Sequence, residues 1–289
     1  MSSSAGKPVL QSERSGASST GGSVPPVAPA GSRLRRTPRN RERSLLWMYL
    51  ATLVLGIAVW WVAAETTDNA LAPKPPDVVA AFGEGLRDGW LVDHTLASLG
   101  RVTLGFALGV ALAIPAGFLM GWYRLARGMI EPWVQFFRTV PPLALIPLVI
   151  VFLGIGESAK VFVIFLAAFL SCVIATFQGV RNVDLTYINA ARVLGARDGT
   201  IFARVVIPAS TPYIFVGMRV ALGSSWATLV AAELLAAPTG LGRMMQSAQQ
   251  FLQTDRIVVG IVMIGALGFA MDRLLLVAER RLTSWQEVR

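Results

Sequence analysis

Long apolar runs separated by short polar segments make up most of the chain from about residue 45 onward. An α-helix needs about 20 apolar residues to cross the hydrocarbon core of a bilayer, and each run approaches or exceeds that length. The pattern therefore predicts an all-α membrane protein whose transmembrane domain covers residues 44–289. Its six transmembrane helices are expected at about residues 45–64, 96–120, 130–153, 161–178, 208–237 and 257–277.

Residues 1–43 precede the first apolar run and are rich in Ser, Gly, Pro and Ala. A segment with so little apolar mass cannot offset the entropy that it loses on ordering, so we expect a disordered tail. Eight Lys or Arg residues and two Glu residues give this tail a net charge of +6, out of +9 for the whole chain. No aromatic residue accompanies the basic ones, so the expected contact is anionic lipid and not nucleic acid.

The run at residues 130–153 differs from the others because it contains Pro141, Pro142 and Pro147. Proline interrupts helical hydrogen bonding, and inside a bilayer the freed carbonyl groups must be satisfied by protein or by a water-filled cavity. We therefore expect a break in this span, with Pro141 and Pro142 facing the protein interior.

Two amphipathic segments lie between the apolar runs and predict short helices outside the bilayer. The first covers about residues 77–90, and Asp77 is expected to cap its N-terminus. The second covers about residues 240–254. Neither segment is long or apolar enough to cross a membrane.

Charge asymmetry between the polar segments sets the expected orientation. Segment 65–94 holds six acidic and two basic residues, whereas four other segments are rich in basic residues. Six spans place those four segments on one side, which the positive-inside rule identifies as the cytoplasm. We therefore expect a multi-pass protein of the plasma (inner) membrane with both termini in the cytoplasm. The basic segments are the tail, the loop with Arg124 and Arg127, the loop at 181–207, and the end from Arg280.

Composition excludes several classes of function. A mean hydropathy of +0.58 is too high for an ordinary soluble domain. The single cysteine, Cys172, allows no intrachain disulfide, and one Cys with one His, His94, leaves no ligand set for a metal cluster. His94 is expected at the surface. Because the sequence contains no His/Asp/Ser cluster and no phosphate-binding glycine loop, we expect no catalytic site, no metal site and no bound cofactor.

The polar loop between the fourth and fifth spans carries a distinctive spacing. Asn189-Ala190-Ala191 is followed after three residues by Gly195, and nine further residues separate Gly195 from Val205. This pattern resembles the signature E-A-A-x3-G-x9-I-x-L-P of ABC-importer permeases. Asn189 stands where that family has an acidic residue, which leaves this chain without the usual carboxylate at that point.

The resemblance implies a coupling loop over residues 181–207, which in ABC-importer permeases docks on an ATPase subunit. A helix of about three turns is expected at 186–197, and Gly195 can end it by adopting a left-handed backbone. Pro208 suits the first turn of a helix and is expected to mark the start of the fifth span. The residues of this candidate interface are Asn189, Ala190, Ala191, Arg192, Gly195, Arg197 and Pro208.

Further segments resemble the nitrate/sulfonate/taurine branch of these permeases, and taurine and alkanesulfonate permeases most of all. They lie at 138–147, 152–157, 226–242, 246–255 and 280–285, within a resemblance that covers residues 45–285. It implies a type I importer fold, with two permease copies around a pathway and no bond-breaking chemistry in this chain. It also implies two ATPase subunits that bind ATP and Mg, an extracytoplasmic solute-binding protein, and no nucleic acid.

The implied solute is a small anion, with taurine or another aliphatic sulfonate in first place. Nitrate, bicarbonate, a pyrimidine precursor and an aromatic acid stay open as alternatives, because specificity in such systems resides largely in the binding protein. A non-transporting membrane scaffold is a further alternative, although it needs neither a coupling loop nor a proline-broken span.

Polar residues inside the spans are candidates for the translocation pathway or its gate, because burying them against lipid is costly. Glu233 fits either an ion pair or a membrane-surface position, or else a direct gate or solute contact. Arg138 and Arg219 fit either a contact with an anionic solute or a structural pair or interfacial position. Trp226 fits a gate or a packing role, and Asp272-Arg273 an end-of-helix pair. The candidates are Arg138, Pro141, Pro142, Arg219, Ser225, Trp226, Thr228 and Glu233.

Overall fold

A computed structural model describes residues 40–66 and 72–283, with side chains from residue 47 onward. These ranges are helical almost throughout and contain no strand, which confirms the all-α prediction. Helix α1 (Asn40–Thr66) begins inside the segment that was expected to be disordered to residue 43, so that boundary is wrong. The apolar run that follows is continuous with these residues, and one helix includes both. The rest of the expected tail lies outside the described residues.

The other helices follow in chain order and are joined by short turns. Five described helices are long and apolar enough to cross a membrane, or six if the bent pair of α4 with η1 and α5 counts as one span. The elements are α2 (Pro75–Arg87), α3 (Trp90–Trp122), α4 (Arg124–Thr139), η1 (Pro142–Leu145), α5 (Ile146–Leu153), α6 (Glu157–Arg181), α7 (Leu185–Val193), α8 (Asp198–Ile201), η2 (Phe202–Val206), α9 (Ile207–Ala236), α10 (Leu241–Gln250) and α11 (Thr254–Leu282).

The proline-rich third span is sharply bent. Helix α4 and the pair formed by η1 and α5 meet at an angle of 90°. Pro141 lies at the bend with φ −59° and ψ 127°, outside helical geometry, and Pro142 opens η1. The predicted break is therefore present. Pro142 is half-buried but Pro141 is exposed, so the expectation that both face the interior is wrong for Pro141.

The fifth span begins earlier than predicted. Helical backbone continues from α8 through the π-helical η2 into α9, so that Asp198–Ala236 forms one candidate span. Pro208 is the second residue of α9 and has no N–H, and the N–H of Ile207 bonds to the carbonyl of Phe202, five residues back. The π-helical turn accommodates the proline without ending the helix. Pro208 therefore lies in the first turn of α9, as expected, although the candidate span also includes the helical turns that precede it.

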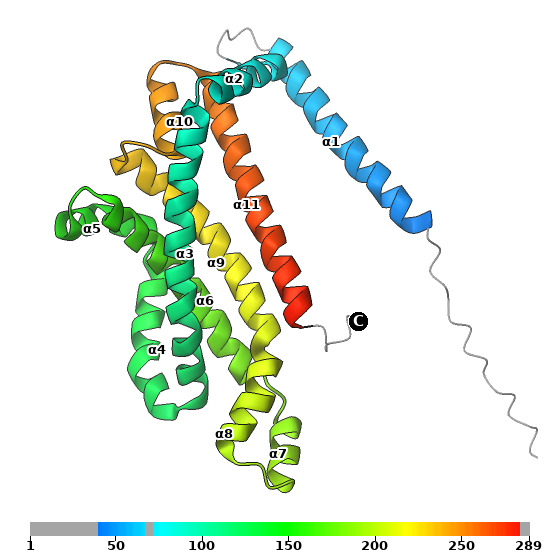
Figure 1. Cartoon of the computed structure of the whole chain (residues 1–289), viewed down its shortest axis with the longest axis vertical. Helices are drawn as coiled ribbons and strands as arrows, with labels where there is room; N and C mark the ends of the chain where they lie inside the picture. The colour runs from blue at the N-terminus through cyan, green and yellow to red at the C-terminus, as the bar shows by residue number, and fades with distance from the viewer. Residues whose placement is uncertain (1–39, 67–71, 284–289) are drawn as a thin grey trace, which may run out of the picture. The chain divides into compact units, whose positions relative to one another are not determined.

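Helices α3, α6 and α9 pack side by side at the centre of the bundle (Figure 1). The face of α3 toward α6 carries small residues at intervals of four. A Cβ atom at Gly109 would lie only 2.6 Å from the Cβ of Ala168, so glycine is required for this close approach. Gly105, Gly117 and Gly121 meet Ile164, Thr176 and Val180 in the same way. Small residues are the usual means of close helix packing in a bilayer, where apolar burial alone does not favour association.

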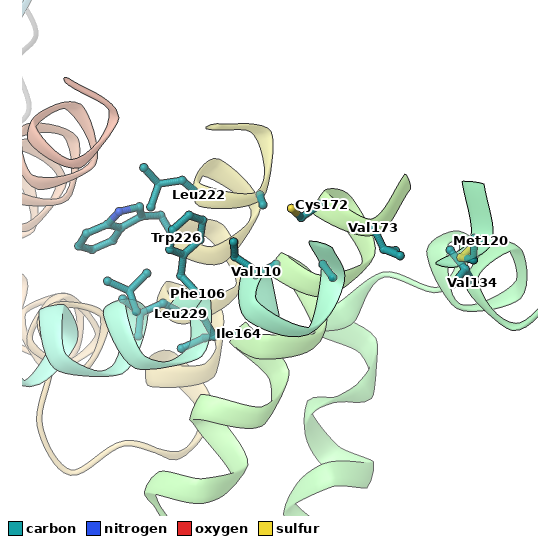
Figure 2. Packing of buried hydrophobic residues seen from close by; sticks show 14 residues of the cluster. Phe106, Val110, Met120, Val134, Ile164, Cys172, Val173, Leu222, Trp226 and Leu229 are labelled. Atoms are coloured by element: carbon teal, nitrogen blue, oxygen red, sulfur yellow. The ribbon is translucent and has the colours of Figure 1, made fainter. Parts of the chain in front are cut away.

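An apolar cluster fills the space between the central helices. Figure 2 shows Trp226 of α9 beside Leu222, Phe106 and Leu229. Trp226 is buried, and a Cβ added at Gly268 of α11 would lie 3.6 Å from its ring. Of the two roles expected for Trp226, the geometry favours packing.

Short helices occupy the two ends of the bundle. Helices α2 and α10 lie at one end, and α7 and α8 lie at the opposite end (Figure 1). In α2 the carboxylate of Asp77 accepts a hydrogen bond of 3.2 Å from the backbone N–H of Lys74. Lys74 is therefore the N-cap and Asp77 the third helical residue, which corrects the predicted cap.

Gly109→Ala is expected to destabilise the protein by about 1–3 kcal/mol, because the added methyl group overpacks the contact between α3 and α6. The measurement is the thermal unfolding of the detergent-solubilised protein. Gly100→Ala is the matched control on the same helix, since nothing lies within 4 Å of its added Cβ. Equal unfolding temperatures for the two variants would contradict the close approach of these helices.

Candidate functional site

An open recess of about 350 Å³ lies between α4, η1, α6 and α9. Its polar groups are Arg138 from the last turn of α4, Ser171 of α6, and Ser224 and Thr228 of α9. The hydroxyl oxygens of Ser171 and Ser224 are 3.4 Å apart. The remaining lining residues are Val140, Pro142, Ala167, Leu170, Ile174 and Ala227. A guanidinium and three hydroxyl groups on an apolar wall are suited to bind a small oxyanion.

The recess brings together some of the residues expected in the pathway and leaves others out. Arg138, Pro142 and Thr228 line it. Ser225 is buried instead, and its hydroxyl donates a 2.8 Å hydrogen bond to the carbonyl of Ala221, so it does not reach the recess. A hydroxyl bonded inside its own helix is satisfied locally and needs no solute.

Arg219 also points away from the recess. It makes a two-pronged ion pair with Asp272 of α11, with Nε–Oδ1 at 2.7 Å and Nη2–Oδ2 at 3.1 Å. This geometry supports the structural ion pair that was one of its two expected roles. The expected pair of Asp272 with Arg273 is therefore wrong. Asp272 pairs with Arg219, and the guanidinium of Arg273 lies 4.6 Å from the centre of the Phe269 ring.

Glu233 is fully buried at the junction of α9 with α3 and α10. Its carboxylate accepts hydrogen bonds from Ser98 Oγ at 2.8 and 2.9 Å, from Arg101 Nη1 at 2.7 Å and from the backbone N–H of Gly242 at 2.9 Å. Of the alternatives for Glu233, the geometry is that of a buried ion pair. Its oxygens are occupied by these donors, so none is directed at the recess.

Arg101 is the centre of this cluster, and all five of its N–H donors are used. Beyond Glu233, it makes a two-pronged pair with Glu157 of α6 and donates to the carbonyl and hydroxyl oxygens of Thr239. Lys160 Nζ donates to the same Glu157 carboxylate at 2.8 Å. One guanidinium thereby joins α3, α6, α9 and the turn before α10. We call Ser98, Arg101, Glu157, Lys160 and Glu233 the polar cluster.

Sequence reasoning identified only Glu233 within the polar cluster. A signal for Arg101 was present, because a lone arginine inside an apolar run is costly unless it is paired. The pairing with Glu157 joins residues 56 positions apart, so no local pattern indicates it. His94 was expected at the surface but is half-buried, and its Nδ1 accepts a 2.9 Å hydrogen bond from the N–H of Gly240.

The loop after α6 forms the short helix α7 at the opposite end of the bundle (Figure 1). Asp184 caps it by accepting a 2.8 Å bond from the N–H of Thr186, which lowers the pKa of that carboxyl group. Gly195 follows with φ of +80°, which confirms the predicted left-handed helix end. The helix ends at Val193, so the expected extent to residue 197 is wrong. Arg197 instead precedes α8 as its N-cap residue.

Helix α7 packs one face against the protein, and its opposite face is not covered by any described residue. Ile188 and Ala191 pack against a cluster formed by Val180, Val183, Ile201 and Val206. The opposite face exposes Asn189 and Ala190, and the helix end exposes Val193 and Leu194 at 88% and 87%. The remaining exposed apolar residues of this surface are Leu185 and Tyr187. An exposed apolar surface of this kind is typical of a contact with another protein.

Residues 109–284 match the family described as binding-protein-dependent transport system inner membrane component. A probable ABC transporter permease protein of Brucella abortus (strain 2308) is 60% identical over 248 residues, which is 86% of this chain and 99% of the relative. The taurine transport system permease protein TauC of Escherichia coli (strain K12) is 38% identical over 257 residues, or 86% and 92% of the two chains. The bicarbonate transport system permease protein CmpB of Synechococcus elongatus is 37% identical over 232 residues, or 76% and 84%.

Solved structures agree with this at the level of the fold. A crystal structure of an amino acid ABC transporter superposes with a TM-score of 0.58 at 15% identity, covering 69% of this chain and 97% of the other. The matched family covers the recess, the polar cluster from Glu157 onward and the α7 loop. This chain therefore belongs to the binding-protein-dependent transport system inner membrane components, and it is a multi-pass membrane permease of an ABC importer.

Proposed function

We propose that this permease carries a small organic sulfonate, taurine or a related aliphatic sulfonate, and that the recess beside Arg138 lies on its pathway. The observation that carries the proposal is the lining of the recess, where Arg138 lies together with Ser171, Ser224 and Thr228. A sulfonate offers three oxygens that accept hydrogen bonds, and this wall offers a cation and three hydroxyl groups, two of which, on Ser171 and Ser224, also lie within hydrogen-bond distance of each other.

The shape and lining of the recess favour an organic anion over an inorganic one. About 350 Å³ is far more room than nitrate or bicarbonate occupies, and Leu170, Ile174 and Ala227 add an apolar wall. Methylene groups gain from contact with such a wall, whereas a small inorganic anion does not. Sequence identity does not separate these solutes, because taurine and bicarbonate permeases match this chain almost equally well.

The exposed surface of α7 is the proposed docking site for an ATPase subunit, which binds ATP and Mg and supplies the energy. Arg192, Arg197 and Arg204 make this end of the bundle basic, so the positive-inside rule supports a cytoplasmic position, with both termini on the same side. Helices α2 and α10 then face the extracytoplasmic solute-binding protein. A second permease copy completes the pathway by covering the open side of the recess, and two ATPase subunits serve the pair.

A direct mechanical connection links α7 to the recess. Helix α7 rests on α8 and η2 through Ile188 and Ala191, and α8 and η2 continue into α9. Helix α9 carries Ser224 and Thr228. Movement of α7 by the ATPase subunits therefore shifts the hydroxyl groups relative to Arg138 on α4, and the importer alternates between two states of different solute affinity.

Uptake of labelled taurine by cells that contain the complete importer tests the solute. ATP-dependent uptake that alkanesulfonates inhibit, and that nitrate and bicarbonate do not, is the expected result. Competition by nitrate or bicarbonate at equal concentration would reject the sulfonate assignment and leave the permease in place.

Arg138→Gln is expected to lower uptake about tenfold or more without loss of folded protein, because it removes one charge-assisted hydrogen bond worth about 1.5–3 kcal/mol.

Glu233→Gln is expected to act differently from Arg138→Gln. It removes the fully buried one of the two carboxylates that pair with Arg101, and it lowers stability by about 3–5 kcal/mol. Uptake and thermal unfolding are measured for both variants. Normal stability of Glu233→Gln with abolished uptake would instead support a gate role for Glu233.

Val193→Glu is expected to weaken association with the ATPase subunit by about tenfold or more, because it places a charge in an apolar contact. The measurement is co-purification of the ATPase with the membrane-inserted permease. Val79→Glu on α2 is the matched control, since it makes the same change at an exposed valine at the other end of the bundle. Equal ATPase recovery with both variants would reject docking at α7.

A further inference from the structure

A second and larger hollow lies at the end of the bundle that carries α10. It has a volume of about 600 Å³ and opens to the outside between the start of α6, the end of α9 and α10. Three of its lining residues are charged, namely Glu157, Lys160 and Arg243. The others are Ile150, Ile155, Gly156, Leu235, Ala236, Ala237 and Pro238. This volume is within the usual range of small-molecule sites.

The two cations of the hollow, Lys160 and Arg243, each have N–H donors that no described residue accepts. Lys160 is 3% exposed, and its bond to Glu157 uses one of the three donors of an ammonium group. Arg243 donates to Gln246 at 3.0 Å, which uses one of five donors. Arg101 nearby has no donor left. Any oxyanion that enters the hollow is therefore expected to meet Lys160 and Arg243.

Glu157 offsets the charge of its cationic neighbours and leaves Arg243 as the net positive charge of the hollow. Its two oxygens already accept from Arg101 and Lys160, and this pairing holds the carboxylate in place. Glu233 pairs with Arg101 in the same cluster. The cations Arg101, Lys160 and Arg243 outnumber the carboxylates Glu157 and Glu233 by one, which leaves one positive charge at the wall of the hollow. Arg243 is the cation of these three that has no carboxylate within salt-bridge distance among the described residues.

The hollow and the recess beside Arg138 are aligned. On α6, Lys160 in the hollow and Ala167, Ser171 and Ile174 in the recess follow spacings of 7, 4 and 3 residues, which place them on one face of the helix.

On α9, Ser224, Thr228 and Leu235 share a face in the same way. Between the two cavities, Ile146 and Val149 of α5 pack against α6 and α9. The two cavities therefore lie along the same two helices, α6 and α9, and α5 packs between them.

We propose that the hollow is an outer binding site for an organic sulfonate, in which Lys160 and Arg243 hold the sulfonate oxygens before the solute passes α5 to the recess. This inference rests on the proposed function, because it takes from it the class of solute and the direction of transport. The apolar lining at Ile150, Ile155 and Leu235 receives the carbon chain.

The test uses thiol labelling in the assembled importer, in right-side-out membrane vesicles. Leu235→Cys places a thiol on the wall of the hollow, and Val79→Cys on α2 is an exposed control outside it. Cys172, the single native cysteine, is buried, so the parent protein supplies the background. Each variant is treated with a methanethiosulfonate that carries an ethylsulfonate group and with the matched trimethylammonium reagent.

The expected result is that Leu235→Cys reacts faster with the sulfonate reagent, by about tenfold relative to the ratio at Val79→Cys, because the cations concentrate anions in the hollow. Taurine and ethanesulfonate are expected to slow this reaction. Adding Arg243→Gln removes both effects, whereas Arg243→Lys keeps them.

Equal ratios at the two positions, or no protection by either sulfonate, would overturn the outer site. Labelling only after the vesicles are permeabilised would overturn its outer position as well. Taurine uptake by the same vesicles is measured separately. Uptake without protection rejects the outer site alone, whereas absent uptake rejects the proposed function from which the site takes its solute.

Discussion

The pairing of the buried Arg101 guanidinium with two carboxylates is the interaction on which one half of this permease depends. In our proposed orientation this half is the extracytoplasmic one. A charge at this position is tolerated only because two carboxylates and the oxygens of Thr239 use every donor that it has. Each partner belongs to a different part of the chain. The ends of α3, α6 and α9 and the turn before α10 are therefore held in one arrangement, and removal of either Glu233 or Glu157 leaves the buried Arg101 with one carboxylate partner in place of two.

The glycine stripe of α3 and the polar cluster act together. Gly105 lies four residues after Arg101 on the same face of α3, where the helix meets Ile164 of α6. Close approach of the two helices brings Arg101 within reach of Glu157, and the ion pair in turn sets their relative register. The small residues allow close packing along the length of both helices, whereas the polar contacts fix the relative position of the helices at one end.

The same central helices also line the recess and the hollow that we propose as parts of the solute pathway. Helices α6 and α9 present one face to the recess and to the hollow, and another face to the glycines of α3 and the core around Trp226. Residues one to three positions apart on α9 therefore have different roles: Ser224 and Thr228 line the recess, while Ser225 and Trp226 lie in the buried core outside it. A pathway on one face and a rigid core on the other allow α9 to move as a unit when α7 is displaced.

The sequence by itself determined the all-α class, the apolar helices, the break at the tandem prolines, and the helix end at Gly195. These features depend on hydrophobic length and on the backbone limits of proline and glycine, which act within a few residues. Only the tertiary structure decided which polar residues face a cavity. Glu233 pairs with Arg101 across 132 positions and Arg219 with Asp272 across 53, while Arg138 lines the recess. A side chain inside a membrane helix finds its partner through helix packing, and that partner cannot be found from spacing along one helix.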